Sequence, residues 1–243
     1  MLHIVQTLSV FTGIFAAGMV SGTTGMAFPL IAGPIFLLIY APPKAVALTA
    51  MCSLTGQVFS IALLRRSIDY ELRLPLIAAG LVGVPLGTAL LNCCDHHLVR
   101  ITLGGLIVIS ALWGLLQKSS HTLLSCSRLS QVLVGLSGGL TGGLVGASSV
   151  VPALWYATRG LSKQQQRAIT QPYIMGMQMA SLLALRFSGA LDQLLVRQYL
   201  YFLLPLLAGV GIGVVCFHAV SSSAAARLVM SVVTVSGIVL LVA

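Results

Sequence analysis

Acidic residues are scarce in this sequence, whose 243 residues include four Asp and Glu against 13 Lys and Arg. Charged residues of both signs make up only 7% of the chain, while 58% of its residues are hydrophobic. Soluble domains carry about 25% charged residues, and so few polar side chains do not cover a water-soluble globule. The composition therefore excludes an ordinary soluble protein and predicts a chain embedded in the lipid bilayer.

Sequence patterns of metal sites, disulfide frameworks and nucleic-acid binding are also missing. The five cysteines form no CxxC pair, and the five histidines form no HxxxH or HxxE pair. No run of consecutive basic residues indicates a face for nucleic acid. No nucleophile–base pair is evident either, so we expect no enzyme, no cofactor, no metal and no nucleic-acid partner.

The four carboxylates, Asp69, Glu71, Asp95 and Asp192, all map to loops between apolar stretches. Proton-driven transporters commonly carry an Asp, Glu or His within the membrane, and none is evident here. Coupling to protons would therefore need a loop carboxylate or the substrate itself as the carrier. The same absence argues against a cation as substrate, because no buried negative charge is available to hold it.

Apolar stretches of about 20 residues, the length of a membrane-spanning helix, separate the charged clusters. The predicted spans lie near residues 46–64, 72–91, 98–116, 168–185, 197–217 and 224–242. Two further pairs of apolar stretches, 4–20 with 27–40 and 131–141 with 150–158, are short and are interrupted by glycines and hydroxyl residues. Such residues free the backbone from a helix, so both pairs predict broken helices. Only His3 precedes the first stretch, which argues against a cleavable signal peptide.

The chain repeats itself at a separation of 121 residues without a gap. The equivalent pairs are Gly18/Gly139, Gly22/Gly143, Gly25/Gly146, Ala47/Ala168, Thr49/Thr170, Gln57/Gln178, Ser60/Ser181, Leu64/Leu185, Arg65/Arg186 and Ser67/Ser188. Duplication in a membrane protein is typical of a transporter whose site lies between the copies. We divide the chain into a first repeat over 1–117, a connecting loop over 118–130 and a second repeat over 131–243.

Loop charge indicates how each interrupted pair crosses the membrane. If each pair is a hairpin that enters and returns, nine of the 13 basic residues lie on one side; if each is one broken span, the split is seven to six. Cytoplasmic loops are enriched in Lys and Arg, so the hairpin is favoured. A hairpin returns the chain to the side where it began, and three spans then carry it to the other side of the membrane, so the second copy is inserted upside down. The predicted fold is therefore an all-α membrane protein of two inverted repeats, each a broken-helix hairpin plus three transmembrane helices, with both termini outside.

Two groups of polar residues are candidates for a substrate site between the repeats. The first group flanks the interruptions, where the half-helices after Gly25 and after Ser149 would direct their positive N-terminal ends towards one region. The second group lies on the next spans, where Thr49, Ser53 and Gln57 share one helix face. The candidate substrate-binding residues are Thr23, Thr24, Gly25, Thr49, Gln57, Ser148, Ser149, Thr170, Gln171 and Gln178.

Each group also has a purely structural interpretation. Glycines spaced by four residues, such as Gly18 and Gly22, allow two helices to pack closely. A glutamine in the middle of a span can hold two helices together, because an unsatisfied amide is costly there. Arg65 and Arg186 lie at equivalent helix ends, where they are solvated anchors or attract anions at a cavity mouth.

An ordered set of short motifs runs through both copies. In the first copy it comprises Gly18-Met-Val-Ser-Gly22-Thr-Thr-Gly25, Pro34, the run from Ala41 to Thr49, Arg65-Arg66, Asp69, Leu74-Pro75-Leu76, Gly80, Gly83 and Gly87. In the second copy it comprises Arg159-Gly160-Leu161-Ser162-Lys163 and Arg167-Ala168-Ile169-Thr170. The set resembles the TauE/SafE family of anion permeases along nearly the whole chain. Two departures are Gly25-Met26-Ala27-Phe28 in place of the family's first glycine cluster and Ser148-Ser149-Val150-Val151 in place of its Gly-Gly-Pro-Pro.

The resemblance implies transport of sulfur-containing anions such as sulfite, a sulfonate or thiosulfate. We expect a secondary permease of the bacterial inner membrane that moves a small anion by alternating access at a midplane site. Its expected partners are the lipid bilayer and a small anionic substrate, and a homo-oligomer is left open. An uncoupled anion channel and a non-transport subunit of a membrane complex are the alternatives. The residues around the two interruptions differ between the copies, and we expect them to select the anion.

Overall fold

The computed structural model describes residues 2–64, 74–116, 127–157, 163–219 and, near the C-terminus, 234, 237–238 and 240. Within these ranges the chain is helical apart from short connections. The helices are α1 (Leu2–Thr24), α2 (Phe28–Ile39), α3 (Pro42–Leu64), α4 (Leu74–Cys93), α5 (His96–Leu116), α6 (Arg128–Val145), α7 (Val150–Ala157), α8 (Lys163–Phe187) and α9 (Gln193–Ala219). The predicted span near 224–242 lies largely outside the described residues.

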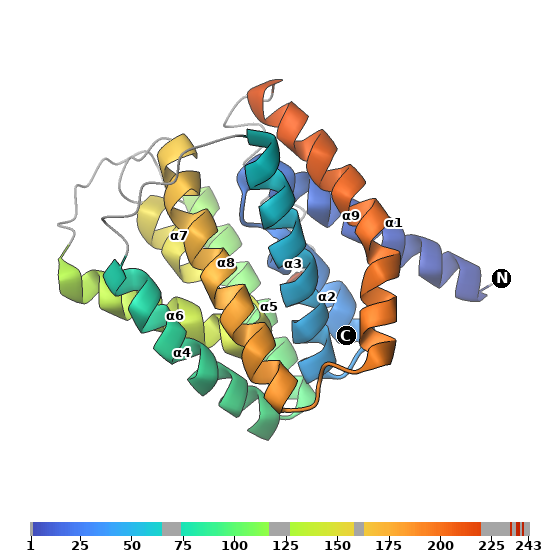
Figure 1. Cartoon of the computed structure of the whole chain (residues 1–243), viewed down its shortest axis with the longest axis horizontal. Helices are drawn as coiled ribbons and strands as arrows, with labels where there is room; N and C mark the ends of the chain where they lie inside the picture. The colour runs from blue at the N-terminus through green and yellow to red at the C-terminus, as the bar shows by residue number, and fades with distance from the viewer. Residues whose placement is uncertain are drawn as a thin grey trace.

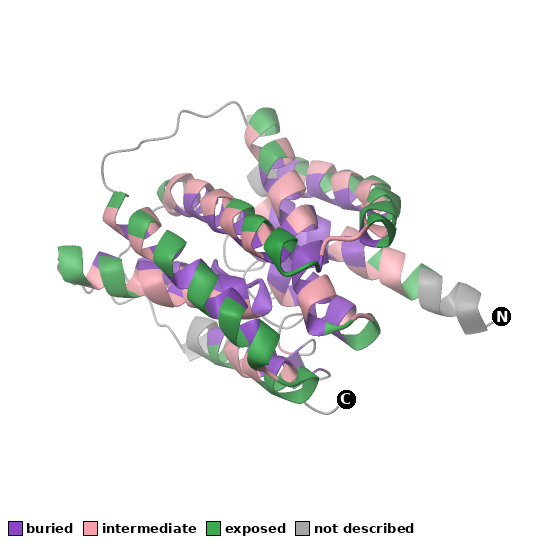
Figure 2. Ribbon diagram, turned by 60° about the horizontal axis from the view of Figure 1, so that its bottom comes forward, coloured by how far each residue is buried: buried purple, intermediate pink, exposed green. Residues whose placement is uncertain are grey.

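Three of these helices are long and apolar enough to cross a membrane: Pro42–Leu63, Leu74–Cys93 and Gln193–Cys216. Leu8–Thr24, Phe28–Ile39 and His96–Ser110 are shorter apolar helices. Large apolar side chains such as Leu204 and Val215 of α9 are exposed, and Figure 2 shows exposed residues along the outer faces and buried ones towards the middle. The predicted all-α membrane fold is confirmed.

Both predicted interruptions are hairpins that begin at a glycine. Gly25 follows α1 with a φ of 83°, and Gly146 follows α6 with a φ of 75°, a conformation that other residues rarely adopt. A Cβ added at Gly13 of α1 would lie 2.5 Å from Ile35 of α2, so the chain folds back on itself after Gly25. Gly138 of α6 and Pro152 of α7 approach each other in the same way. We call the connections 25–27 and 146–149 the first and second break.

Each repeat contributes one helix to each of two glycine-rich helix pairs, α1 with α9 and α6 with α4. A Cβ added at Gly22 would lie 2.5 Å from the carbonyl oxygen of Val210, and Gly143 approaches the carbonyl of Val84 as closely. The packing interpretation therefore holds for Gly18, Gly22, Gly139 and Gly143, which let the helix backbones touch. In Figure 1 the two pairs flank the molecule.

The centre of the molecule is formed by α3 and α8, which pack side by side between these pairs (Figure 1). They are equivalent helices in the sequence repeat, yet they run in opposite directions: α3 ends at the edge where α8 begins. Equivalent helices that run antiparallel are what an inverted repeat predicts. The orientation of the two copies relative to a membrane stays a prediction.

Helix α8 begins earlier than the sequence indicates. The predicted span near 168–185 leaves the preceding residues, including Arg167, in a loop, but α8 starts at Lys163 and includes Arg167, which is buried at 4% exposure. The charge of Lys163 and Arg167 suggested a loop because charged residues are rare inside membrane helices. The helix extends because its first turns are rich in glutamine, a good helix former. This correction moves one arginine from the predicted surface to the interior.

Candidate functional site between the two breaks

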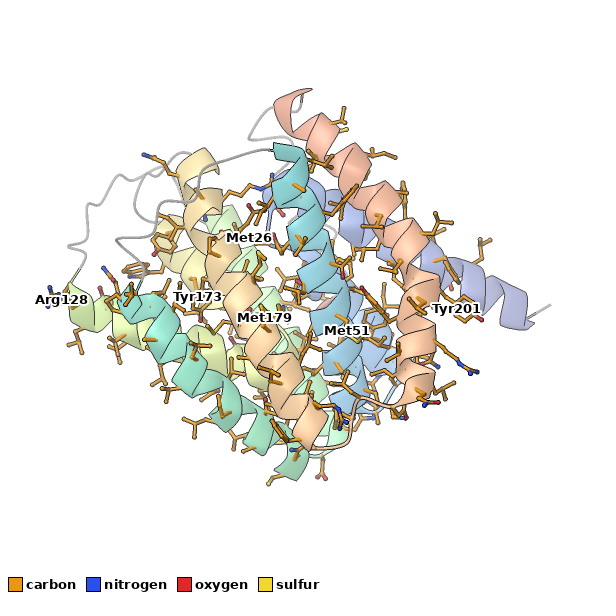
Figure 3. All side chains as sticks on the ribbon, in the orientation of Figure 1. Met26, Met51, Arg128, Tyr173, Met179 and Tyr201 are labelled. Atoms are coloured by element: carbon orange, nitrogen blue, oxygen red, sulfur yellow. The ribbon has the colours of Figure 1, made fainter. Side chains whose placement is uncertain are left out.

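The two breaks touch each other although they lie more than 100 residues apart in the sequence. The hydroxyl of Ser149 in the second break donates to the carbonyl oxygen of Met26 in the first, at 3.0 Å. Figure 3 shows Met26 between α3 and α8. The N-terminal ends of α2 and α7, which begin at Phe28 and Val150, therefore start in the same central region. Both ends carry the positive pole of a helix dipole.

The first break is held by two glutamines, one from each repeat. Gln57 of α3 donates through Nε2 to the carbonyl oxygen of Gly25, at 2.6 Å. Its own Oε1 accepts a hydrogen bond of 3.0 Å from Nε2 of Gln171 on α8. Both side chains are buried. A polar chain thus runs from the second repeat to the turn of the first.

Arg167 completes the first break. Its guanidinium donates through Nη2 to Oγ of Ser60 on α3, and its side chain lies directly on Gly25. A Cβ added at Gly25 would lie 2.8 Å from both Cγ and Nε of Arg167, so only glycine leaves room for this side chain. Guanidinium stays charged at any physiological pH. The first break is therefore a buried, positively charged site.

The second break has the same geometry without the charge. Gln178 of α8 donates to the carbonyl oxygen of Gly146 at 3.4 Å, as its equivalent Gln57 does to Gly25. The helix that packs on Gly146 from the other repeat is α3, through Thr49 and Val46, at 3.3 and 3.7 Å from an added Cβ. In the repeat, Val46 is the equivalent of Arg167. Both breaks are thus polar, but the glycine of the first is covered by a guanidinium and that of the second by a methyl and an isopropyl group.

The family profile described as Sulfite exporter TauE/SafE matches residues 10–240, which include both breaks and the helices that hold them. The chain belongs to the TauE/SafE family. No curated protein and no solved structure matches the chain. The resemblance drawn from the motifs is confirmed, and the chain is a multi-pass membrane protein of a sulfur-anion transporter family.

In this TauE/SafE protein the predicted threonines hydrogen-bond to their own helices. Thr23 and Thr24 donate to the carbonyl oxygen of Val20, at 2.8 and 2.9 Å. Thr24 also accepts from the backbone N–H of Ala27 at 3.3 Å, which closes the first break. Thr49 and Thr170 donate to the carbonyls four residues earlier, at 2.8 and 2.9 Å. In this structure all four hydroxyls therefore donate to the backbone, and their role in substrate binding stays a prediction.

The remaining predicted residues fall into two clusters joined by the contact between the breaks. Gly25, Gln57 and Gln171 lie at the first break, and Ser149 connects it to the second. Gln178 and Ser148 belong to the second break, where Ser148 is fully buried and its hydroxyl finds no hydrogen-bond partner among the described residues.

Sequence reasoning missed Arg167 and Ser60 as members of the TauE/SafE site. Arg167 directly precedes the predicted span near 168–185, which indicates a basic loop residue, and Ser60 stands out only as a member of the repeated pair Ser60/Ser181. The signal was helical spacing: Arg167, Gln171, Ile174 and Gln178 recur at intervals of four, three and four residues, which places them on one helix face. Ser60 lies one turn beyond Gln57 on the matching face of α3.

Proposed function

We propose that this TauE/SafE protein is a secondary permease of the bacterial inner membrane that moves a small sulfur-containing anion, such as sulfite, a sulfonate or thiosulfate. We further propose that the anion binds beside the first break. The observation that carries this proposal is the buried guanidinium of Arg167 against Gly25. No described helix contains Asp or Glu, and the described carboxylates, Asp95 and Asp192, lie in connections between helices. Among the described residues, Arg167 is the one charged side chain that is buried.

The donor set at the first break suits an oxyanion. A planar guanidinium presents several N–H groups in the geometry that oxygen atoms of one anion accept together. The amides of Gln57 and Gln171 lie next to it, and the dipoles of α2 and α7 add positive potential. The other donors are neutral, so the anion is held by a single charge and is able to leave. This balance is what a transport site requires.

Alternating access is supported by burial and by the arrangement of the two repeats. The side chains of Arg167, Gln57 and Gln171 are all buried, so an anion reaches them only after the helices around the breaks separate. The site lies between α3 and α8, the equivalent antiparallel helices of the two copies. Separation on one side and then on the other would expose the same site to each side of the membrane in turn.

The direct test is counterflow of labelled sulfite in proteoliposomes, with methanesulfonate and thiosulfate as further substrates. We expect saturable counterflow from the natural protein and a loss of about 10- to 100-fold in kcat/KM for Arg167→Gln, as expected for a lost hydrogen bond to a charged ligand. Arg167→Lys should retain part of the rate because it keeps the charge. Gln57→Leu and Gln178→Leu are a matched pair of variants. Gln57→Leu should reduce the counterflow rate more, because Gln57 bonds to the charged first break and Gln178 to the uncharged second break.

Three outcomes would contradict the proposal. Equal rates for the natural protein and Arg167→Gln would remove the anion from the first break. Flux that rises linearly with concentration and shows no counterflow would indicate an uncoupled channel. Isolated protein that transports none of the three anions, yet copurifies with a fixed partner, would indicate a subunit of a membrane complex.

A further inference from the structure

Ser53 lies on α3 midway between the two breaks. On the same helix face, Thr49 contacts Gly146 of the second break and Gln57 bonds to Gly25 of the first. Ser53 is four residues from each, on a face that covers about 12 Å between them at 1.5 Å per residue. The breaks touch through Ser149 and Met26, and the helical spacing places Ser53 on the face of α3 that contacts both of them.

The register between α3 and α8 places Ser53 at the centre of the duplication. Ser60 pairs with Arg167 and Gln57 pairs with Gln171, so lower residue numbers on α3 lie opposite higher residue numbers on α8. One further turn brings Ser53 opposite Ile174. These two residues are equivalents at the separation of 121 residues. In the inverted repeat that the sequence predicts, a residue that faces its own equivalent lies on the local twofold axis relating the copies.

The hydroxyl of Ser53 is buried and unused. Its side chain is 2% exposed, and Oγ has no hydrogen-bond partner in the part of the chain that the structure describes. Other hydroxyls on these helices, such as those of Thr49, Thr55 and Thr170, donate to the carbonyl four residues earlier. Ser53 does not donate to that carbonyl. A buried hydroxyl without a partner is destabilising, which calls for an explanation.

We propose that Ser53 is a further substrate-binding residue, whose hydroxyl donates to an oxygen of the anion as it passes between the two breaks. The proposal rests on the proposed permease function and adds a donor on the twofold axis to the off-axis charge of Arg167. The ligand class is an oxyanion with more than one acceptor oxygen, one for the guanidinium and one for Ser53. Ile174 on the opposite helix offers no donor, so this central contact comes from α3 alone.

Ser181 provides a matched control on α8. It is also a buried serine, 1% exposed, whose hydroxyl lacks a partner within the described residues. Its unused hydroxyl has a different explanation. Ser181 is the equivalent of Ser60, which accepts from Arg167, and the residue equivalent to Arg167 is Val46, which offers no donor. Ser181 therefore has no donor at the place equivalent to Arg167, whereas Ser53 lies where we propose that the anion passes.

The test compares Ser53→Ala, Ser53→Thr and Ser181→Ala in purified protein with sulfite, methanesulfonate and thiosulfate as probes. Thermal unfolding without anion checks folding, and anion-dependent thermal shift and counterflow report Kd and KM. Ser53→Ala should raise Kd and KM about tenfold, the effect of one hydrogen bond to a charged ligand. Ser53→Thr, which keeps the hydroxyl, should restore most of the affinity. Ser181→Ala should leave both constants unchanged.

Equal Kd values for Ser53→Ala, Ser181→Ala and the natural protein would overturn this proposal. If Arg167→Gln still lost transport in that case, the proposed function would stand and only the role of Ser53 would fall. If the natural protein neither bound nor moved any of the three probes, the proposed function and the role of Ser53 would fall together. The two failures therefore give different results.

Discussion

At the residue scale, a single residue difference between the copies gives the first break a charge that the second break lacks. Arg167 and Val46 occupy equivalent places, each packed on the glycine that opens the other copy's break. The equivalent serines Ser60 and Ser181 therefore differ in their hydrogen bonding. Ser60 accepts a hydrogen bond from Arg167, whereas the hydroxyl of Ser181 has no partner among the described residues. The asymmetry between the breaks thus resides in a packed side chain on α8 as much as in the break residues themselves.

Replacing Gly25 by alanine should reduce transport, and the same replacement at Gly189 is the control. Both have positive φ, 83° and 75°, so alanine at either place strains the backbone by about 1–2 kcal/mol. A Cβ at Gly189 meets nothing within 4 Å among the described atoms, whereas one at Gly25 meets Arg167. Gly25→Ala and Gly189→Ala should both lower the melting temperature. Only Gly25→Ala should reduce sulfite counterflow per folded molecule. Normal counterflow from folded Gly25→Ala would show that the position of Arg167 against this turn is irrelevant.

At the element scale, the sequence predicts helices that have an uninterrupted apolar pattern and helices that end at a glycine. The glycines and hydroxyls at 21–25 and 142–149 correctly predicted both breaks, because backbone freedom is a local property of these residues. The predicted start of α8 was wrong by several residues, since Arg167 follows a polar first turn whose composition is typical of a loop. Its burial depends on Gly25 and Ser60, which are more than 100 residues away in sequence. No local pattern encodes that contact.

The start of α9 is tied to the start of α3 by Asp192, and this link should depend on pH. Oδ2 of Asp192 accepts from Nζ of Lys44 at 2.7 Å, while Oδ1 caps α9 by accepting from the N–H of Leu195. The Lys44 hydrogen bond, helped by Leu195, lowers the pKa of Asp192 below its ordinary value. Since the folded pKa is the lower one, the stabilisation is present above about pH 4 and is lost as the pH falls through the folded pKa.

Asp192→Asn should therefore melt slightly below the natural protein at pH 7, and the difference should disappear as the pH falls through the lowered pKa of Asp192. The effect should be small and should shrink in high salt, because both side chains are about 40% exposed. Lys44→Met is the control and should reproduce the loss at neutral pH. A difference in melting temperature that stays constant while the pH falls from 7 until Asp192 is protonated would show that the ion pair does not contribute.

At the scale of the whole molecule, the pairing of helices follows the duplication. Helix α1 pairs with α9 as its equivalent α6 pairs with α4, and α3 pairs with its own equivalent α8. Every one of these contacts joins one copy to the other, so neither copy forms the site by itself. The sequence repeat predicts that the site lies between the copies. It does not predict which helix of one copy packs on which helix of the other, because that choice depends on contacts between the copies.

The orientation of the copies in the membrane leads to a labelling prediction. In Figure 1 the connection between α4 and α5 lies at the same edge as that between α8 and α9, and α3 ends at the opposite edge. If the repeats are inverted as loop charge predicts, the α4–α5 edge faces outwards. With the five native cysteines replaced, His97→Cys should react with an impermeant maleimide added outside spheroplasts. Ser162→Cys and Ser222→Cys, at positions outside the described residues, should react only in inverted vesicles. Labelling of position 97 from the cytoplasmic side would overturn this topology, because the exposed start of α5 would then lie inside.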